Sequence, residues 1–138
     1  MDNDICERLR EFLNANDRFC AVNGIRIEKL SPGFAEAVLD VTPDKLNGVG
    51  FVQGGAIFTL IDLAFAGAAN SGNVPTVAMT SSINFLRPGT GGRLRAVAHE
   101  VNRGRRTTLC TIEVFDERGK LVARCSTTGF IGEGKMID

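Results

Sequence analysis

The chain has 138 residues, which fits a single domain that can bury a sizeable core and fold without disulfides or metals. Its 16 basic and 16 acidic residues cancel, so the overall charge gives no reason to expect a nucleic-acid or anionic-membrane partner. The four cysteines form no CxxC pair and the one histidine is His99, so we expect buried, reduced thiols and neither a metal site nor a redox centre.

The N-terminal segment is charged and amphipathic. Residues 1–13 contain acids and arginines where a secretory signal requires an uninterrupted apolar stretch, so we expect a cytoplasmic protein. Within residues 2–14, apolar side chains recur at helical spacing, at Ile5, Leu9, Phe12 and Leu13. This spacing predicts a short helix whose apolar stripe packs on the rest of the domain.

Residues 24–41 alternate apolar and polar side chains about the turn sequence Ser31-Pro32-Gly33, which predicts a hairpin followed by a loop. Residues 54–70 are then apolar on almost every side, interrupted only by Thr59 and Asp62, and predict a buried central helix. A membrane span is the alternative. The segment is short, contains three glycines and carries an acid at its middle, so we expect no membrane insertion.

Four strand-like runs separated by short turns follow the central helix, at 76–87, 93–102, 105–116 and 120–131. Turns this short join antiparallel neighbours. One long apolar helix between a first hairpin and a strand meander predicts an α+β domain in which an antiparallel sheet of five or six strands wraps around the helix. This is the arrangement of the hotdog fold. Without repeats or linker-like stretches, we expect one domain over residues 1–138.

Asp62 is the first candidate for catalysis, because a carboxylate in the middle of an apolar helix is costly unless it is hydrogen-bonded or faces a cleft. The alternative is that Asp62 bonds a neighbour and only fixes the packing. Thr59, Ala66 and Ala69 lie on the same side of the helix as Asp62. Their small side chains could border a cleft or a subunit contact. The opposite side carries Ile57, Leu60, Ile61, Ala64 and Ala68.

Gly54 and Gly55 begin the central helix, where unpaired N–H groups and the positive end of the helix dipole can hold an oxyanion. A glycine pair alone is equally consistent with an ordinary flexible start of a helix. Eight residues of helix separate Gly54 from Asp62 by about 12 Å, whereas both groups must lie about 3 Å from one reacting carbonyl group. A two-fold dimer would bring Gly54 of one subunit to Asp62 of the other, so we expect a homodimer or a dimer of dimers.

A tight turn at residues 102–106 carries three cations, Arg103, Arg105 and Arg106, around Gly104. Guanidinium groups suit phosphates, so this turn is a candidate clamp for a nucleotide tail, although a solvated turn explains the charges as well. His99 has no cysteine or second histidine near it in sequence, and we leave it outside the site.

These residues resemble the phenylacetate-pathway (PaaI-like) branch of the hotdog thioesterases. The pattern of that branch is an asparagine, a short loop, His-Gly-Gly and an aspartate eight residues after the first glycine. The corresponding residues here are Asn47, Gln53, Gly54, Gly55 and Asp62. The strand sequence at 82–89 and the Arg-Gly-Arg turn at 103–105 are also similar to that family, and the likeness covers about residues 20–132.

The resemblance implies hydrolysis of an acyl-CoA thioester to a free acid and CoA, with CoA as part of the substrate and no separate cofactor. It implies that the Gly54 amide polarises the thioester carbonyl, with Gly55 beside it, and that Asp62 is a general base or a nucleophile. Asn47 and the residue at 53 would orient water and the carbonyl. The residues implied to line the pantetheine channel are Thr80, Ser82 and Asn84.

One residue departs from the family pattern. Gln53 replaces the usual histidine and cannot become a cation near neutral pH, although it can still donate and accept hydrogen bonds. The alternative function is therefore a non-catalytic acyl-CoA-binding hotdog protein. A dehydratase or hydratase is a further alternative, but it needs a histidine paired with a carboxylate, and His99 lies in no such motif.

Overall fold

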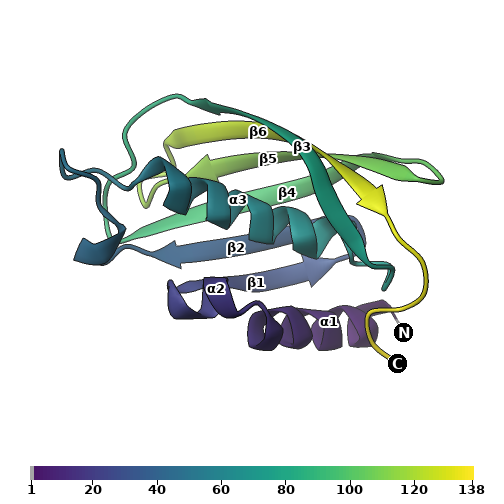
Figure 1. Ribbon diagram of the computed structural model, residues 1–138. Helices are drawn as coiled ribbons and strands as arrows, with labels where there is room; N and C mark the ends of the chain where they lie inside the picture. The colour runs from purple at the N-terminus through teal and green to yellow at the C-terminus, as the bar shows by residue number, and fades with distance from the viewer. Residues whose placement is uncertain (1) are drawn as a thin grey trace.

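A computed structural model of the chain describes residues 2–138, apart from the side chains of the first two of them (Figure 1). Its helices are α1 (Asp2–Asn16), α2 (Arg18–Val22) and α3 (Gly54–Ala69), with the 3-10 turn η1 (Pro43–Lys45). Its strands are β1 (Ile25–Ser31), β2 (Phe34–Asp40), β3 (Thr76–Phe85), β4 (Arg93–Arg103), β5 (Thr107–Phe115) and β6 (Leu121–Ile131).

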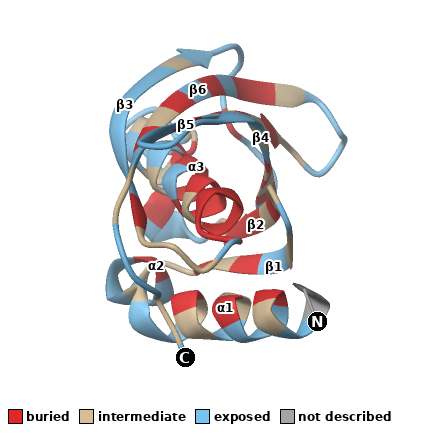
Figure 2. Ribbon diagram, turned by 90° about the vertical axis from the view of Figure 1, so that its right-hand side faces the viewer, coloured by how far each residue is buried: buried red, intermediate tan, exposed pale blue. Residues whose placement is uncertain are grey.

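All six strands form one antiparallel sheet in the order β1-β2-β4-β5-β6-β3. Viewed end-on, the sheet curls around α3, which lies along its concave face (Figure 2). The α+β arrangement predicted from the sequence, with a hairpin, a central helix and a four-strand meander, is confirmed. The core is the space between helix and sheet, because the apolar side of α3 meets the inward side chains of every strand there.

Helix α3 is buried over most of its surface but not over all of it. The side predicted to face the core is fully covered, as are Leu63 and Phe65. Asp62 and Phe58 are exposed on the other side, whereas Ala69, which was expected to share that side, is completely buried near the helix end. The central helix therefore has one open face, and the sheet wraps the rest.

Close packing of α3 on the sheet depends on Gly67. A Cβ atom placed there would lie 2.7 Å from the Cβ of Ala35 and 3.2 Å from Cδ1 of Ile27. We expect Gly67→Ala to lower the free energy of unfolding by about 1–2 kcal/mol, because overpacking outweighs the gain in helix propensity. Chemical denaturation measures this change. Gly72→Ala is the matched control, since a Cβ at Gly72 meets nothing within 4 Å, and equal stabilities for both variants would contradict the packing.

The two edges of the sheet differ. At the β1 edge, α1 covers the strand, and the side chain of Asn14 both donates to the carbonyl and accepts from the N–H of Ile27, at 2.9 and 2.8 Å. At the other edge, β3 pairs only with β6 and is exposed along nearly all of its ten residues. A long edge with no charged residue or proline is open to pairing with another strand.

The structure corrects several of the expected boundaries. The first helix continues to Asn16, and a second one, α2, follows it; five residues are too few for a periodicity to predict. Strand β5 begins at Thr107 rather than 105, because Gly104 donates its N–H to the Thr107 carbonyl and closes the turn. Strand β3 ends at Phe85 rather than 87, before Pro88, which has no N–H to donate.

Candidate functional site

A cavity of about 420 Å³ lies at the N-terminal end of α3. It brings together two residues predicted for the site, Asn47 and Gly54. Most of its remaining wall is apolar, formed by Phe51, Val52, Ile57, Phe85, Leu86, Pro88 and Gly89, with Arg87 at one side. An apolar recess with a few polar groups is typical of a small-molecule site.

The Gly54 amide is an available donor in this cavity. No acceptor within residues 2–138 receives a hydrogen bond from its N–H. The fold does not itself require glycine at this position, since a Cβ atom would meet only the Phe85 ring, at an ordinary contact distance of 3.7 Å. The missing side chain therefore leaves the amide accessible from the cavity, where the first N–H groups of a helix can bind a polarised oxygen.

Gln53 uses the neighbouring amide. Its side-chain oxygen accepts a hydrogen bond from the N–H of Gly55, so Gln53 is the N-cap of α3. The predicted pair of glycine amides is thus divided, with Gly55 committed to the cap and Gly54 open. The N–H of Gly55 already donates to Gln53, so it is not available to bind a substrate in this arrangement.

Asn47 organises the loop that precedes α3. Its side-chain oxygen accepts hydrogen bonds from the backbone N–H groups of Val49 and Phe51, at 2.9 and 3.1 Å. The backbone N–H of Asn47 donates to the Phe51 carbonyl at 2.7 Å. Its side-chain NH₂ donates to no acceptor in the described part of the chain. The loop therefore holds Asn47 at the cavity wall with a donor free to meet a substrate.

Asp62 lies on the open face of α3, two turns beyond Gly54, with the exposed side chain of Phe58 one turn before it. Although solvent reaches its side chain in the single chain, surrounding protein raises the pKa of its carboxyl above the ordinary value, and the nearby carboxylate of Asp17 adds to the effect. No ion pair or hydrogen bond from the described side chains of residues 4–138, or from the described backbone, holds the Asp62 carboxylate. The carboxylate is thus free to act on a bound molecule.

The predicted channel residues lie on the far side of strand β3. Thr80, Ser82 and Asn84 pair with β6 residues on the outer face of the sheet, whereas Ser81 faces inward and hydrogen-bonds the buried Thr127 at 2.9 Å. A bulge after Ala78 sets this register. Within one chain, these three side chains therefore point away from α3 and the cavity at its N-terminus.

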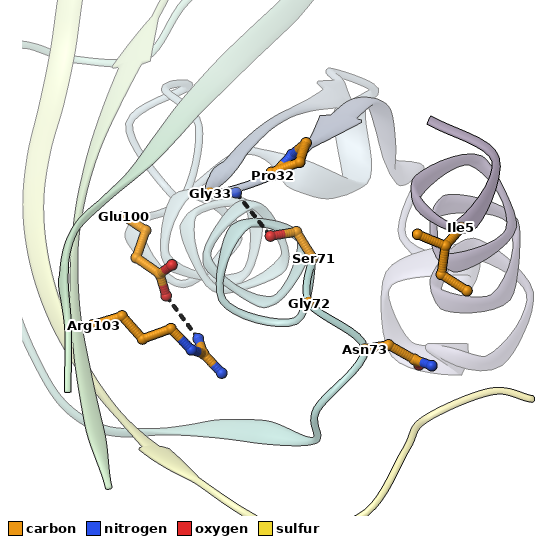
Figure 3. A pocket seen from close by; sticks show the side chains of 8 residues that line it. All are labelled: Ile5, Pro32, Gly33, Ser71, Gly72, Asn73, Glu100 and Arg103. Carbon is orange, nitrogen blue, oxygen red and sulfur yellow. Dashed lines mark hydrogen bonds and ion pairs between the residues drawn. The ribbon is translucent and has the colours of Figure 1, made fainter. Parts of the chain in front are cut away.

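The predicted phosphate clamp lies at the opposite end of α3 from Gly54, about 22 Å along the helix axis. Figure 3 shows Arg103 there, beside a second cavity of about 440 Å³. Its guanidinium donates to Glu100 at 2.8 Å and to the carbonyl of Ala69 at 3.0 Å. Arg105 and Arg106 are exposed, and neither forms an ion pair with the described residues.

Comparison with known proteins places this geometry in a family. The family model described as "Thioesterase superfamily" matches residues 49–123, which include Gly54, Asp62 and every residue of the cavity wall except Asn47. The chain belongs to the thioesterase superfamily. It is 39% identical over 109 residues to the acyl-coenzyme A thioesterase PaaI of Escherichia coli, covering 78% of each chain.

Solved structures of relatives support the same conclusion. The structure of Escherichia coli PaaI superposes with a TM-score of 0.93 at 32% identity and covers 98% of this chain and 99% of that one. A hypothetical thioesterase from Streptococcus pneumoniae, solved with coenzyme A, matches with a TM-score of 0.79 at 27% identity, covering 88% of this chain and 98% of that one. The hotdog fold of this thioesterase is thus shown by its topology and by these matches.

The cysteines of this thioesterase are poorly suited to be its nucleophile. All four are buried. Burial raises the pKa of the Cys20 and Cys110 thiols to about 12 and also raises the pKa of Cys125, so these thiols are protonated near neutral pH. Among residues 2–138, no three His, Cys, Asp or Glu side chains gather as metal ligands do, and no helix is long and apolar enough to cross a membrane.

Two residues near the site were missed by the sequence analysis. Phe85 contributes to the wall beside Gly54, and Asp17 places a second carboxylate near Asp62. Both approach α3 from distant parts of the chain, so no local pattern could have identified them. His99 lies on the outer face of the sheet, with its ring 5.1 Å from that of Phe34, away from the open face of α3.

The raised pKa of Asp62 predicts the pH dependence of this thioesterase. The role of general base that the sequence analysis assigned to Asp62 requires its deprotonated form, so this role predicts that kcat/KM falls as the pH drops through a pKa above the 3.8 of an ordinary aspartate. Asp17→Asn removes one cause of the increase while keeping a side chain that can cap α2. We expect the acid limb of the pH–rate profile to move to lower pH in this variant. An unchanged limb would exclude the influence of Asp17.

Proposed function

We propose that this thioesterase hydrolyses acyl-CoA, with Asp62 of one subunit and the Gly54 amide of another acting on the same thioester. The observation that carries the proposal is the unpaired N–H of Gly54, which lines an apolar cavity at the start of α3. The same helix carries the Asp62 carboxylate, which has no described partner. Similarity to an acyl-CoA thioesterase and to a structure containing coenzyme A supports the choice of substrate.

In the proposed reaction, the acyl chain lies in the cavity and the thioester carbonyl oxygen accepts a hydrogen bond from Gly54. Asp62 takes a proton from a water molecule whose oxygen attacks the carbonyl carbon. The tetrahedral intermediate then collapses and breaks the C–S bond, and Asp62 gives its proton to the leaving sulfur, so that the CoA thiol and the free acid are released and the Asp62 carboxylate is restored. Direct attack by Asp62, giving an acyl-enzyme anhydride that water hydrolyses, is the other route open to the same carboxylate. The free NH₂ group of Asn47 can orient the carbonyl or the water.

The shared site requires at least a homodimer, and the open edge at β3 supports one. Its ten residues contain no charge, and Val77 and Met79 expose 64% and 56% of their surfaces. Because α1 covers the β1 edge, β3 is the edge that a second copy can extend. Antiparallel pairing of two β3 strands would set the exposed faces of the two α3 helices side by side. A dimer of dimers and a cytoplasmic location remain part of the proposal.

A panel of acyl-CoA substrates tests the reaction directly. Released thiol is measured for acetyl, hexanoyl, phenylacetyl and palmitoyl CoA. We expect turnover, with the highest kcat/KM for acyl groups that fill the apolar cavity. Hydrolysis of none of them would contradict the proposal.

The same panel distinguishes the enzyme from a non-catalytic acyl-CoA-binding protein, the alternative that Gln53 keeps open. Gln53→His restores the residue usual in the similar family. If Gln53 already performs the positioning, this variant should change activity only by a modest factor. Turnover in Gln53→His together with none in the natural chain would identify the protein as a binding protein.

A further inference from the structure

A second recess adjoins the cavity at Gly54 and carries unpaired positive charge. Its volume is about 430 Å³, and Arg87, Arg118 and Lys120 line it. It shares the walls formed by Phe51 and Pro88, and also Arg87, with the cavity that contains the Gly54 amide. The two recesses are therefore neighbouring parts of one surface depression at the N-terminal end of α3.

The cations of this recess are held by backbone structure. The Nε of Arg87 donates to the carbonyl of Leu121 at 3.0 Å, which anchors the guanidinium and leaves its terminal NH₂ groups available. Arg118 and Lys120 belong to the turn between β5 and β6. The carboxylate of Asp116 accepts the backbone N–H groups of both residues, at 2.9 and 3.0 Å, and so fixes the turn.

These cations also differ from most others in the protein. Six arginines lie within 4.0 Å of a carboxylate, namely Arg10, Arg26, Arg93, Arg95, Arg103 and Arg124. None of the three cations in the recess has such a partner among the described side chains, those of residues 4–138. The neighbouring acid, Glu117, instead accepts the N–H of Gly92. The recess is thus lined by three cations and by one carboxylate, that of Asp116, which already accepts two backbone N–H groups.

We infer that this recess binds the phosphate groups of the CoA nucleotide in the same chain whose Gly54 amide holds the thioester. The inference rests on the proposed function and names a part of its substrate site. Cations without a carboxylate partner suit an anion, because binding it relieves their mutual repulsion and forms charge-assisted hydrogen bonds. The shared wall places the two recesses side by side, so one extended ligand could occupy both. The turn at 103–106, in contrast, lies at the far end of α3 from this amide.

The test compares two double variants that remove equal charge. Arg118→Gln/Lys120→Gln alters the recess, and Arg105→Gln/Arg106→Gln alters the turn at the other end of α3. Each is assayed with an acyl-CoA and with the matching acyl N-acetylcysteamine thioester, which lacks the nucleotide. For the recess variant we expect KM for acyl-CoA to rise at least about tenfold, as on losing a charge-assisted hydrogen bond, with KM for the short thioester unchanged. The turn variant should raise KM for acyl-CoA less.

Binding of adenosine 3′,5′-bisphosphate, measured by calorimetry, tests the inference without catalysis. This probe carries two of the nucleotide phosphates and no thioester. Its Kd should rise about tenfold or more in the recess variant, and the effect should shrink at high salt. The outer-face variant Lys29→Gln/Arg124→Gln is the charge-matched control and should bind as the natural chain does. An unchanged Kd in the recess variant, or a larger effect from the turn variant, would overturn the inference. If the natural chain bound the bisphosphate and the recess variant did not, but the natural chain hydrolysed no acyl-CoA, only the proposed function would be contradicted.

Discussion

Asp62→Asn is expected to lower kcat by about two to four orders of magnitude for the best acyl-CoA substrate, the usual scale for losing a positioned base. Asparagine keeps the shape and much of the hydrogen-bonding capacity of the side chain but cannot take a proton. The exposed position of Asp62 on α3 means that no packing in the single chain depends on its charge. Steady-state kinetics with released thiol as the signal measures the loss.

Folding and assembly controls separate this result from a structural role. The raised pKa of Asp62 means that its ionised form is disfavoured in the folded chain, so this carboxyl supports stability below about its unfolded pKa and loses that support as the pH rises through the folded pKa. At pH 7 the Asn variant should therefore melt no lower than the natural chain. Light scattering should show the same oligomer. A variant that keeps most of the natural kcat in a folded oligomer would contradict the proposed mechanism, whereas a lower Tm with normal turnover would assign Asp62 to packing.

Mixing two inactive variants should restore activity, because the proposed site takes Asp62 from one subunit and Gly54 from another. The second variant is Gly54→Val, whose side chain enters the cavity beside Phe85 and blocks access to the amide. Each variant alone should retain under about 1% of the natural activity. Random pairing gives half hybrid dimers, each with one intact site of two, so the equimolar mixture should recover about a quarter of the natural activity.

Purified hybrid dimers, selected with two different affinity tags, should reach about half of the natural activity per dimer. Recovery of dimers that carry both tags demonstrates that the subunits exchange, and tagged hybrids of Asp62→Asn with the natural chain, which hold one intact site under either arrangement, provide the activity reference. If each site were built from one chain, a hybrid would hold two defective sites and the mixture would stay inactive. That outcome, with exchange demonstrated, would exclude the shared site.

Much of the fold could be predicted from the chain because its signals are local. Seventeen consecutive residues without a polar face at 54–70 indicated a central helix, and α3 covers all but the last of them. Short turns likewise located the four strands after the helix within two residues at each end, and the alternation at 24–41 located the first hairpin. Helix α2 has no comparable signal, because a single turn and a half contains too few residues to show a period.

The candidate site was predictable only in part. The sequence singled out Asp62, because a carboxylate is costly within an apolar helix, and Gly54, because it begins that helix. It could not distinguish the two glycine amides, which the Gln53 cap separates into one occupied and one open donor. The face of β3 on which Thr80, Ser82 and Asn84 lie was equally out of reach, because one bulged residue reverses which side chains point outward.

The type and order of the elements follow from local sequence patterns, because helical and strand periods are properties of neighbouring residues. Tertiary structure alone decided which sheet edge is covered, since α1 reaches β1 and leaves β3 open. It also decided which cations are free. Arg103 finds Glu100 and the end of α3, whereas Arg87, Arg118 and Lys120 meet at one recess without a carboxylate partner in the described chain. Ion pairing depends on distances between side chains that are far apart in sequence, and only the folded chain sets those distances.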